Sequence, residues 1–326
     1  MKNNLSLPNA EDIVLASKRI ADYVCKTPVL VSPDINDIFN ADFFFKCENL
    51  QVTGAFKFRG AFNALVNLKD QEKKLGVITF SSGNHAQAIA KASEILGIKS
   101  TILMPKDAPR IKISNTKKHN NCNIVLYDRY KDDREQILDQ LIKKTGAIPI
   151  SSYNNNDVIA GSGTVVKELF EEVHDLDAVF MGVGGGGLLS GSSLYIKEKK
   201  PLCSIYGVEP INANDGQISL RTGILTRINT PKTIADGAQT QSLGEKNFYI
   251  IQKYVKDILT VSDSQLINSM STLADKLKII VEPTGCLGFA AIQNIKNEIK
   301  NKRVGIIITG GNIDLINFIH LIQSNV

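Results

Sequence analysis

Short runs of β-branched residues alternate along this chain with longer segments in which apolar residues recur at helical spacing. The first example leads from the strand-like GVITF through the helical AQAIAKASEILG to the strand-like STILMP. The alternation continues through NIVLYD, DREQILDQLIKK, AIPIS, DVIAGSGTVVKELFEEV, AVFMGV, SIYGVEP, SQLINSMSTLADKL, IIVEP, TGCLGFAAIQNIKNEI and RVGIIITGG. Because strands that alternate with helices usually pair in parallel, the pattern predicts an α/β fold with mostly parallel sheet.

The length of the chain suits one large domain or two modest ones. Its 326 residues are 43% hydrophobic, which is enough for a sizeable buried core. No repeat, low-complexity tract or linker interrupts the alternating pattern. If the chain forms two lobes, we therefore expect chain segments to cross between them.

Charge and cysteine content restrict the possible partners. The formal net charge of +5 is spread over many lysines without a basic tail, which argues against nucleic-acid binding. No apolar stretch is long enough to span a bilayer and the N-terminal segment lacks a signal core, so we expect no membrane association. The scattered cysteines indicate free thiols in a reducing compartment, the cytoplasm. They are Cys25, Cys47, Cys122, Cys203 and Cys286.

The segment ENLQVTGAFKFRGAFNAL predicts a helix with a lysine in an unusual place. Apolar residues recur at helical spacing after a possible cap at Thr53, so Lys57 and Arg59 fall in the first turn. Cations at this end oppose the helix dipole, which indicates another use for their charge. Two phenylalanines flank Lys57, and apolar neighbours lower the pKa of an amine and keep it nucleophilic. The alternative is a surface lysine whose stem packs on apolar neighbours.

A polar turn, SSGNH, directly follows the strand-like GVITF and precedes a helical segment. Ser81, Ser82, Asn84 and His85 therefore lie where backbone N–H groups at a helix start point toward a ligand. An ordinary helix cap needs fewer polar side chains than this turn carries. Open parallel sheets bind ligands beyond the carboxyl ends of their strands, so the turn is a candidate binding site.

Four consecutive glycines, Gly184–Gly187, follow the strand-like AVFMGV and precede another helical segment. Such a run costs chain entropy, and a tight turn needs only one or two glycines. Backbone amides without side chains at a helix start form an anion-binding site. The run therefore predicts a phosphate-binding loop.

A rival interpretation of the glycine run is a dinucleotide-binding fold. Gly182, Gly184 and Gly187 match G-x-G-x-x-G, and Glu209 ends the next strand near the usual acidic spacing. A nicotinamide-dependent oxidoreductase is therefore a second hypothesis. It leaves Lys57, the SSGNH turn and a C-terminal TGGN sequence without a function.

The last strand-like run, IIITGGN, ends in Thr309, two glycines and Asn312. With this element the sequence resembles the fold-type II pyridoxal-phosphate enzymes, specifically the serine/threonine dehydratase and serine racemase family, which includes threo-3-hydroxyaspartate dehydratases. The lysine block, SSGNH, the glycine run and TGGN occur in the order of that family, with ADG and EP sequences between them. The resemblance covers essentially the whole chain.

The resemblance implies a tryptophan-synthase-β-like α/β fold with two open, twisted, mostly parallel sheets and flanking helices. It implies a large cofactor-binding domain formed by residues 1–76 and 150–326, with a small mobile substrate domain at residues 77–149. The usual assembly of relatives is a homodimer. The chain ends soon after its last strand and helix, so we do not expect the feedback control that an added regulatory module gives larger allosteric members.

The resemblance also implies a pyridoxal 5'-phosphate site. Lys57 would hold the cofactor as a Schiff base and take the Cα proton of a small amino-acid substrate. The remaining cofactor contacts would be Phe56, Asn84, Gly184, Gly185, Gly186, Gly187 and Thr309. Thr309 would face the pyridine nitrogen with a hydroxyl, which weakens the electron sink relative to a carboxylate and favours loss of a β-leaving group. The substrate carboxylate would be held by Ser81, Ser82, Asn84 and His85.

The implied reaction is dehydration and deamination of L-serine or L-threonine to a keto acid and ammonia. Ser82 matches the serine that acts as acid/base on the face opposite the lysine in serine racemases, whereas many threonine dehydratases have SAGNH. Racemisation of serine is thus a further expected activity, and carboxylate binding is the alternative role of Ser82. Glu209, the carbonyl of Ala213 and Asp215 match a divalent-cation site for Mg²⁺, or for Ca²⁺ or Mn²⁺. Two acidic residues in an exposed loop are the alternative.

Substrate choice stays open. The stretch TIADGAQTQSLG resembles the branch with threo-3-hydroxyaspartate dehydratases, and Arg134 aligns with an arginine that meets acidic ligands. Arg134 could bind a second substrate carboxylate, or pair with Asp133 or Glu135 on a helix surface. L-threo-3-hydroxyaspartate, giving oxaloacetate, is therefore the alternative substrate. A catalytically silent relative is a third hypothesis, and the presence of all the named catalytic positions argues against it.

Overall fold

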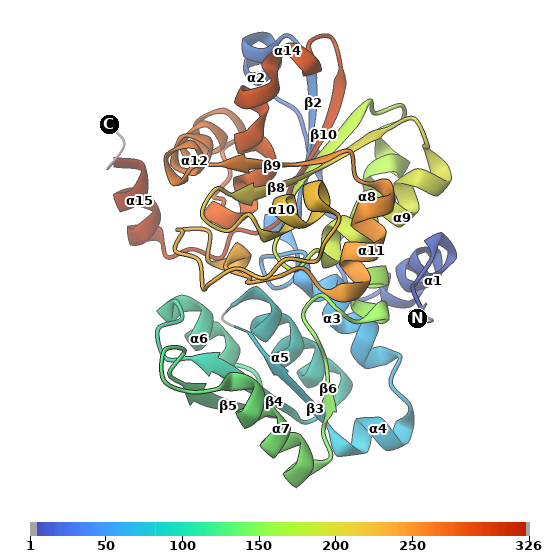
Figure 1. Cartoon of the computed structure of the whole chain (residues 1–326), viewed down its shortest axis with the longest axis vertical. Helices are drawn as coiled ribbons and strands as arrows, with labels where there is room; N and C mark the ends of the chain where they lie inside the picture. Colours follow the sequence, from blue (N-terminus) through green and yellow to red (C-terminus); the bar gives the residue numbers. More distant parts are fainter. Residues whose placement is uncertain (1–4, 82, 324–326) are drawn as a thin grey trace.

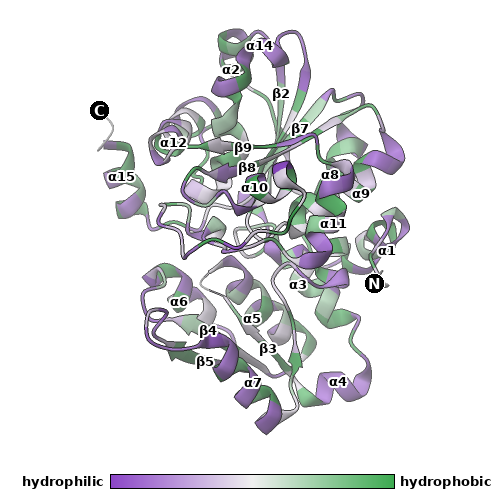
Figure 2. Ribbon diagram, viewed as in Figure 1, coloured by the Kyte–Doolittle hydropathy of each residue, from purple (hydrophilic) through white to green (hydrophobic). Residues whose placement is uncertain are grey.

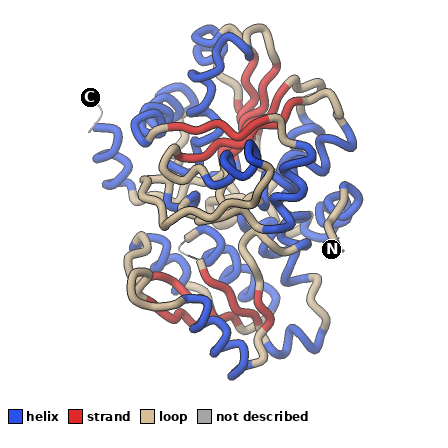
Figure 3. The backbone as a smooth tube through the Cα atoms, in the orientation of Figure 1, coloured by secondary structure: helices blue, strands red, loops and turns tan. Residues whose placement is uncertain are grey.

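The computed structural model describes residues 5–81 and 83–323, which form two open β-sheets. Among these residues, the larger sheet has six strands in the order β1-β2-β10-β7-β8-β9, with every pair parallel except β1 and β2. The smaller has four parallel strands in the order β5-β4-β3-β6. Figures 1 and 3 show the larger sheet in the upper body and the smaller one in the lower body. The predicted fold class is confirmed.

Nearly all the strands predicted from β-branched runs are present. The larger sheet consists of β1 (Val29–Leu30), β2 (Asp42–Cys47), β7 (Ala178–Gly182), β8 (Ser204–Pro210), β9 (Asp257–Val261) and β10 (Arg303–Ile308). The smaller sheet consists of β3 (Val77–Phe80), β4 (Ser100–Pro105), β5 (Cys122–Tyr127) and β6 (Ile148–Pro149).

Helices cover the sheets and connect the strands. The first half of the chain contributes α1 (Ala10–Ile20), α2 (Pro33–Phe39), η1 (Glu48–Leu50), α3 (Lys57–Val66), α4 (Asp70–Leu75), α5 (Asn84–Leu96), α6 (Arg110–Lys117), α7 (Arg134–Thr145) and α8 (Asn156–Glu172). The second half contributes α9 (Gly187–Lys199), α10 (Asp215–Thr222), η2 (Asp236–Ala238), α11 (Glu245–Tyr254), α12 (Asp263–Leu277), η3 (Pro283–Cys286), α13 (Leu287–Ala290), η4 (Ala291–Ile295), α14 (Lys296–Ile299) and α15 (Leu315–Gln323).

The smaller sheet is buried on both faces because successive strand residues point to opposite sides. Val77 and Ile102 belong to a core that includes α3 and α5, whereas Ile78 and Leu103 belong to a second core with α7. Full burial of each such side chain contributes about 1.5–3 kcal/mol. This packing sets the register that brings the ends of β3 and β4 to one edge.

The larger sheet follows the same rule. Phe45 and Ile306 pack with α12 and α13 on one face, whereas Val179 and Ile307 pack with α1, α8 and α9 on the other. Figure 2 shows hydrophilic residues mainly on the outer surfaces of the helices. The glycine run and the TGGN sequence consequently leave the same edge of this sheet, since β7 and β10 are parallel neighbours.

Helix α3 links the two bodies, because it packs against α5 of the smaller one and α8 of the larger one. The chain passes into the smaller sheet after α4 and returns after β6 (Figure 1). Within the described part of the chain, no helix is both long and apolar enough to cross a membrane.

Two sequence predictions near the C-terminal end were wrong. The run IIVEP is not a strand: it lies outside both sheets, Ile279 and Val281 are buried in the core, and Pro283 begins η3. The following segment is not one helix but the succession η3, α13, η4 and α14. It lies close against β7, where a Cβ on Gly288 would approach the Phe180 carbonyl oxygen to 2.9 Å. The apolar residues of these segments correctly indicated that they are buried, but they did not indicate which type of secondary structure the segments form.

Candidate active site

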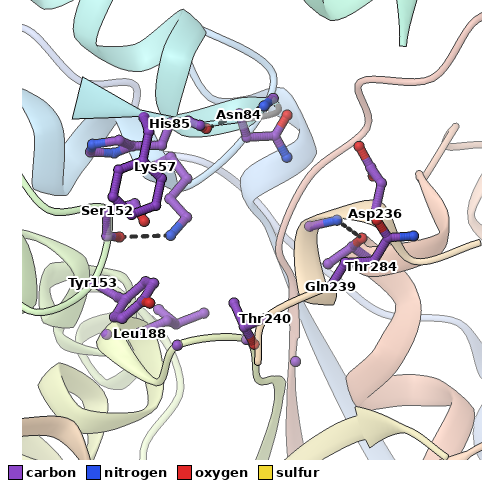
Figure 4. Close-up of a pocket in the computed structure, with 18 of the residues that line it drawn as sticks. Lys57, Asn84, His85, Ser152, Tyr153, Leu188, Asp236, Gln239, Thr240 and Thr284 are labelled. Atoms are coloured by element: carbon purple, nitrogen blue, oxygen red, sulfur yellow. Dashed lines mark hydrogen bonds between the residues drawn. The ribbon is translucent and has the colours of Figure 1, made fainter. Parts of the chain in front are cut away.

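A cavity lies between the two sheets (Figure 4). Its walls come from the turn after β3, the loop after β7 and the residue after β10, which is where open parallel sheets bind ligands. Ser82 lies outside the described residues. The other cofactor and substrate residues predicted from the sequence all line the cavity: Phe56, Lys57, Ser81, Asn84, His85, Gly184, Gly185, Gly186, Gly187, Thr309 and Arg134.

Lys57 is the first residue of α3. The helix has Phe56 as its N-cap and no side-chain cap, so the predicted cap at Thr53 was wrong. The backbone amide of Phe56 donates to the Thr309 carbonyl at 3.0 Å, which ties the helix start to the end of β10. The Lys57 amine donates to the Ser152 carbonyl at 2.9 Å and lies 5.1 Å from the centre of the Phe56 ring. Burial lowers the pKa of Lys57 to about 8, which leaves a nucleophilic neutral fraction near neutral pH.

The glycine run forms a tight loop between β7 and α9. Gly186 has φ +91, a conformation that a side chain disfavours, and a Cβ on Gly185 would lie 2.2 Å from the Tyr153 ring. The Asn247 amide donates to the Gly185 carbonyl at 2.7 Å and holds the loop in place. Backbone N–H groups at the start of α9 are therefore accessible to an anion.

The SSGNH turn presents the start of α5 to the cavity. The amide of Gly83 donates to the Ser81 hydroxyl at 3.2 Å. Asn84 is engaged at both ends of its side-chain amide: it donates to Glu282 at 2.5 Å and accepts from Asn312 at 2.9 Å. Burial and the nearby Lys57 charge lower the pKa of His85 to about 3, so the imidazole is neutral. Figure 4 shows His85 beside Lys57.

Thr309 closes the cavity at the end of β10. Its backbone amide donates to the Gly285 carbonyl at 3.2 Å, and its hydroxyl donates to the Thr284 carbonyl at 3.4 Å. The side chain at this position carries no charge. A pyridine nitrogen next to it would meet a hydroxyl and not a carboxylate.

Sequence reasoning missed a buried charge cluster that joins the two bodies beside the turn. Lys112 of α6 donates to Asp236 at 2.7 Å and to Glu282 at 2.8 Å. Burial alone would lower the pKa of Lys112, but the two carboxylates outweigh it and raise it. The stem of Lys112 packs on Gly83, where a Cβ would lie 2.6 Å from the Lys112 Cδ. The ADG and EP sequences contain both carboxylates and were the available signal, whereas nothing marked Lys112.

Arg134 reaches the cavity from the first turn of α7. Its guanidinium lies 4.5 Å from the centre of the Phe80 ring, and the carboxylate of Glu135 is 4.0 Å away. The surface pairing with Glu135 is therefore loose, and the guanidinium remains available to a ligand.

The predicted metal ligands lie outside the cavity: Glu209 near the end of β8, Ala213 in the following loop, and Asp215 at the start of α10. Glu209 accepts hydrogen bonds from the amides of Gly216 at 3.0 Å and Gln217 at 2.9 Å. Both carboxylate oxygens of Asp215 are buried and lack a hydrogen-bond partner within the described residues. Burial raises the pKa of Asp215 to about 7, and burial together with the Asp215 charge raises the pKa of Glu209. Across the described ranges, no group of three His, Cys, Asp or Glu side chains is placed to hold a metal ion.

The cavity fits pyridoxal phosphate. One wall offers an amine of lowered pKa, as the aldehyde requires, and another offers a glycine loop without side chains at the start of α9, as a phosphate requires. The dinucleotide interpretation fits less well, because Glu209 is occupied by the two amides at the start of α10 and does not line the cavity.

Comparisons with known proteins agree with this geometry. Residues 20–310 match the family model described as pyridoxal-phosphate dependent enzyme. The chain is 54% identical to serine racemase of Schizosaccharomyces pombe, over 99% of this chain and 100% of the relative. It is 53% identical to L-threo-3-hydroxyaspartate ammonia-lyase of Saccharomyces cerevisiae, over 98% of this chain and 97% of that relative. The crystal structure of serine racemase from Dictyostelium discoideum superposes with a TM-score of 0.89 at 39% identity, covering 95% and 100% of the two chains.

The resemblance seen in the sequence is therefore confirmed over nearly the full length of the chain. Matches of this extent and identity exclude the oxidoreductase hypothesis at the level of family. The chain belongs to the family of pyridoxal-phosphate dependent enzymes.

Proposed function

We propose that this chain is an ammonia-lyase that removes water and ammonia from a small β-hydroxy amino acid, with L-serine and L-threonine as its main substrate class. The observation that carries the proposal is the Lys57 amine of lowered pKa, which shares one cavity with the glycine loop. Relatives named serine racemase, L-threo-3-hydroxyaspartate ammonia-lyase and L-threonine ammonia-lyase support it.

The residues of the cavity divide into three functions. Gly184–Gly187 and the start of α9 bind the phosphate, and Lys57 and Phe56 hold the reactive end of the cofactor. Bound pyridoxal phosphate supplies a carbonyl for amines and a ring that accepts negative charge from Cα. The start of α5, with Ser81, binds the substrate carboxylate through N–H groups.

Proton transfer falls to Lys57. An amine with a pKa near 8 exchanges protons at neutral pH, so Lys57 can take the Cα proton and return it to a leaving group. The neutral imidazole of His85 adds no competing positive charge beside it. The Thr309 side chain in the cavity wall is uncharged, which favours elimination over accumulation of negative charge in the ring.

A second candidate substrate is L-threo-3-hydroxyaspartate. Arg134 favours it, because this guanidinium faces the cavity with only a loose contact to Glu135. A serine or threonine side chain gives such a cation no charged partner, whereas a second carboxylate binds it in a bidentate manner.

The test measures keto-acid release from L-serine, L-threonine and L-threo-3-hydroxyaspartate by the cofactor-loaded protein with Mg²⁺ present. Faster turnover of serine or threonine supports the main substrate class. A preference for hydroxyaspartate by orders of magnitude in kcat/KM supports the second candidate. Turnover of none of the three contradicts the proposed elimination.

Racemisation of serine is a separate proposal that depends on Ser82. Chiral chromatography of serine incubated with the wild-type protein and with Ser82→Ala measures it. Loss of D-serine formation with elimination retained supports an acid/base role for Ser82. Equal loss of both reactions indicates that Ser82 binds the substrate carboxylate.

Two further features belong to the proposal. Glu209, Asp215 and the Ala213 carbonyl would hold Mg²⁺, which would stabilise α10 without taking part in chemistry; the unpartnered Asp215 oxygens support this site. Residues 77–149 would move as a substrate domain relative to residues 1–76 and 150–326, supported by the position of the cavity between the sheets. The homodimer and the cytoplasmic location stay predictions.

A further inference from the structure

The cavity has a second guanidinium in its wall, which the sequence did not signal. Arg129 follows β5, two residues past the end of the strand, and its side chain is 19% exposed. The Nε atom donates to Asp107 at 2.8 Å, and Nη1 donates to the side-chain oxygen of Gln239 at 3.3 Å. Arg129 thus reaches from the smaller body to the η2 segment of the larger one.

These two contacts leave some N–H donors of the Arg129 guanidinium without a partner among the residues that the structure describes. A guanidinium carries five N–H donors in one plane. Asp107 holds the Nε edge, and Nη2 has no hydrogen-bond partner in the part of the chain that the structure describes. The remaining donors lie in a residue that lines the cavity, so a ligand can use them.

A ligand carboxylate can replace Gln239 as the hydrogen-bond acceptor for Arg129. The Gln239 amide nitrogen donates to the Thr233 carbonyl at 2.8 Å, which orients its oxygen as the acceptor for Arg129. A bond of 3.3 Å to a neutral amide oxygen is long. A carboxylate forms shorter hydrogen bonds with guanidinium that are roughly twice as strong.

Charge balance distinguishes Arg129 and Arg134 from Lys112, which also lines the cavity. Lys112 is neutralised by two carboxylates at 2.7 and 2.8 Å. The acid nearest to Arg134 is 4.0 Å away and 65% exposed, and the acid paired with Arg129 is 47% exposed. Solvent screens such partners, so both guanidinium groups keep most of their attraction for an anion in the cavity.

We infer that Arg129 is a specificity-determining residue that binds the distal carboxylate of a dicarboxylic β-hydroxy amino acid, together with Arg134, by exchanging Gln239 for the substrate. The inference rests on the proposed β-elimination and deepens its second candidate. With a monocarboxylic substrate such as serine, Arg129 stays on Gln239. Arg129 therefore changes the choice of substrate without touching the reacting atoms.

The experiment compares kcat/KM for L-threo-3-hydroxyaspartate and L-serine in the cofactor-loaded wild type, Arg129→Gln and Arg129→Lys. Loss of a charge-assisted hydrogen bond lowers kcat/KM for hydroxyaspartate by about 10- to 100-fold in Arg129→Gln. Serine turnover stays within about threefold, since its substrate contacts persist. Arg129→Lys keeps the positive charge but loses the planar array of N–H donors, so its kcat/KM for hydroxyaspartate should lie between those of the wild type and Arg129→Gln. Arg221→Gln is the matched control, because Arg221 pairs with Asp257 outside the cavity.

A binding measurement separates recognition from turnover. Calorimetric titration of the holoenzyme with succinate and with butyrate compares two unreactive acids that differ by one carboxylate. Arg129→Gln should weaken succinate binding about tenfold or more and leave butyrate binding unchanged. A purely structural role for Arg129, such as holding the Asp107 loop, would weaken both acids alike.

The outcomes distinguish the inference from the function on which it rests. Loss confined to hydroxyaspartate and succinate supports the role of Arg129. Equal loss for both substrates, or turnover of serine without turnover of hydroxyaspartate in the wild type, overturns that role while the elimination stands. Absence of turnover with every substrate, with succinate binding still dependent on Arg129, contradicts the elimination and leaves the carboxylate site intact.

Discussion

The Lys57 amine donates a hydrogen bond of 2.9 Å to the Ser152 carbonyl, although 95 residues separate the two positions. Ser152 follows β6, where the chain returns from the smaller sheet, and Lys57 begins the helix that links the two bodies. Figure 4 shows the bond across one side of the cavity. The amine is therefore buried at the junction of the two bodies, which is the cause of its lowered pKa.

Uptake of the cofactor should depend on the protonation of Lys57. The neutral amine is the nucleophile, and its fraction rises with pH until the pH exceeds a pKa of about 8, compared with 10.5 for an unperturbed lysine. The rate at which cofactor-free protein gains the visible absorbance of bound pyridoxal phosphate should therefore level off above pH 8. Lys57→Ala should gain no such absorbance and release no keto acid. A rate that still rises about tenfold between pH 8 and pH 9 would show that the amine has an ordinary pKa.

Gly186→Ala should weaken cofactor binding more than it destabilises the fold. Its φ of +91 is strained for alanine, and the added Cβ would lie 2.9 Å from Asn247 and Ile251. The strain costs about 1–3 kcal/mol, and displacement of the loop moves the phosphate-binding amides. Gly97→Ala is the control, because Gly97 has φ +67 and open space around it. Only Gly186→Ala should lower both the melting temperature and the equilibrium affinity for pyridoxal phosphate. Equal affinity in the two variants would contradict the assignment of the loop to phosphate binding.

Arg59→Leu should strongly destabilise the protein. The guanidinium is fully buried and lies 2.7 Å from Glu48 and 2.6 Å from Glu168. Its removal leaves two carboxylates without their main partner, which costs about 3–5 kcal/mol in the free energy of unfolding measured with urea. Lys200→Met, which breaks an exposed pair with Asp175, should cost under about 1 kcal/mol. Similar losses of unfolding free energy in the two variants would show that the buried ion pairs of Arg59 add little to stability.

Mg²⁺ should raise the melting temperature through Asp215. A ligand at about 100 times its Kd stabilises a protein by about 2.7 kcal/mol, and chelation should reverse the effect. Asp215→Asn should abolish the response, whereas Asp175→Asn, at an exposed acid, should retain it. Without metal, Asp215→Asn should be no less stable than the wild type, because it removes a buried carboxylate that has no hydrogen-bond partner among the described residues. A full Mg²⁺ response in Asp215→Asn would place the ion elsewhere.

Local patterns predicted the parts of the site that each lie within one short segment. The lysine at the start of α3, the polar turn after β3, the glycine run after β7 and Thr309 after β10 all followed from residue type and position relative to a strand. Parallel strands bring their carboxyl ends to a common edge, so these segments converge once the fold class is known. Composition alone did not distinguish a strand from buried irregular structure, as IIVEP shows.

The sequence by itself determined the α/β architecture, the family and most of the predicted residues that line the cavity, because these depend on periodicity and on contiguous motifs. Tertiary structure alone decided which distant segments meet. It paired Lys112 with Asp236 and Glu282, placed the Ser152 carbonyl on the Lys57 amine, and brought Arg129 across to Gln239. Each of these contacts joins positions about a hundred residues apart or more, and no local propensity encodes them. They arise because α3 packs against α5 of the smaller body and α8 of the larger one, which brings the two bodies together.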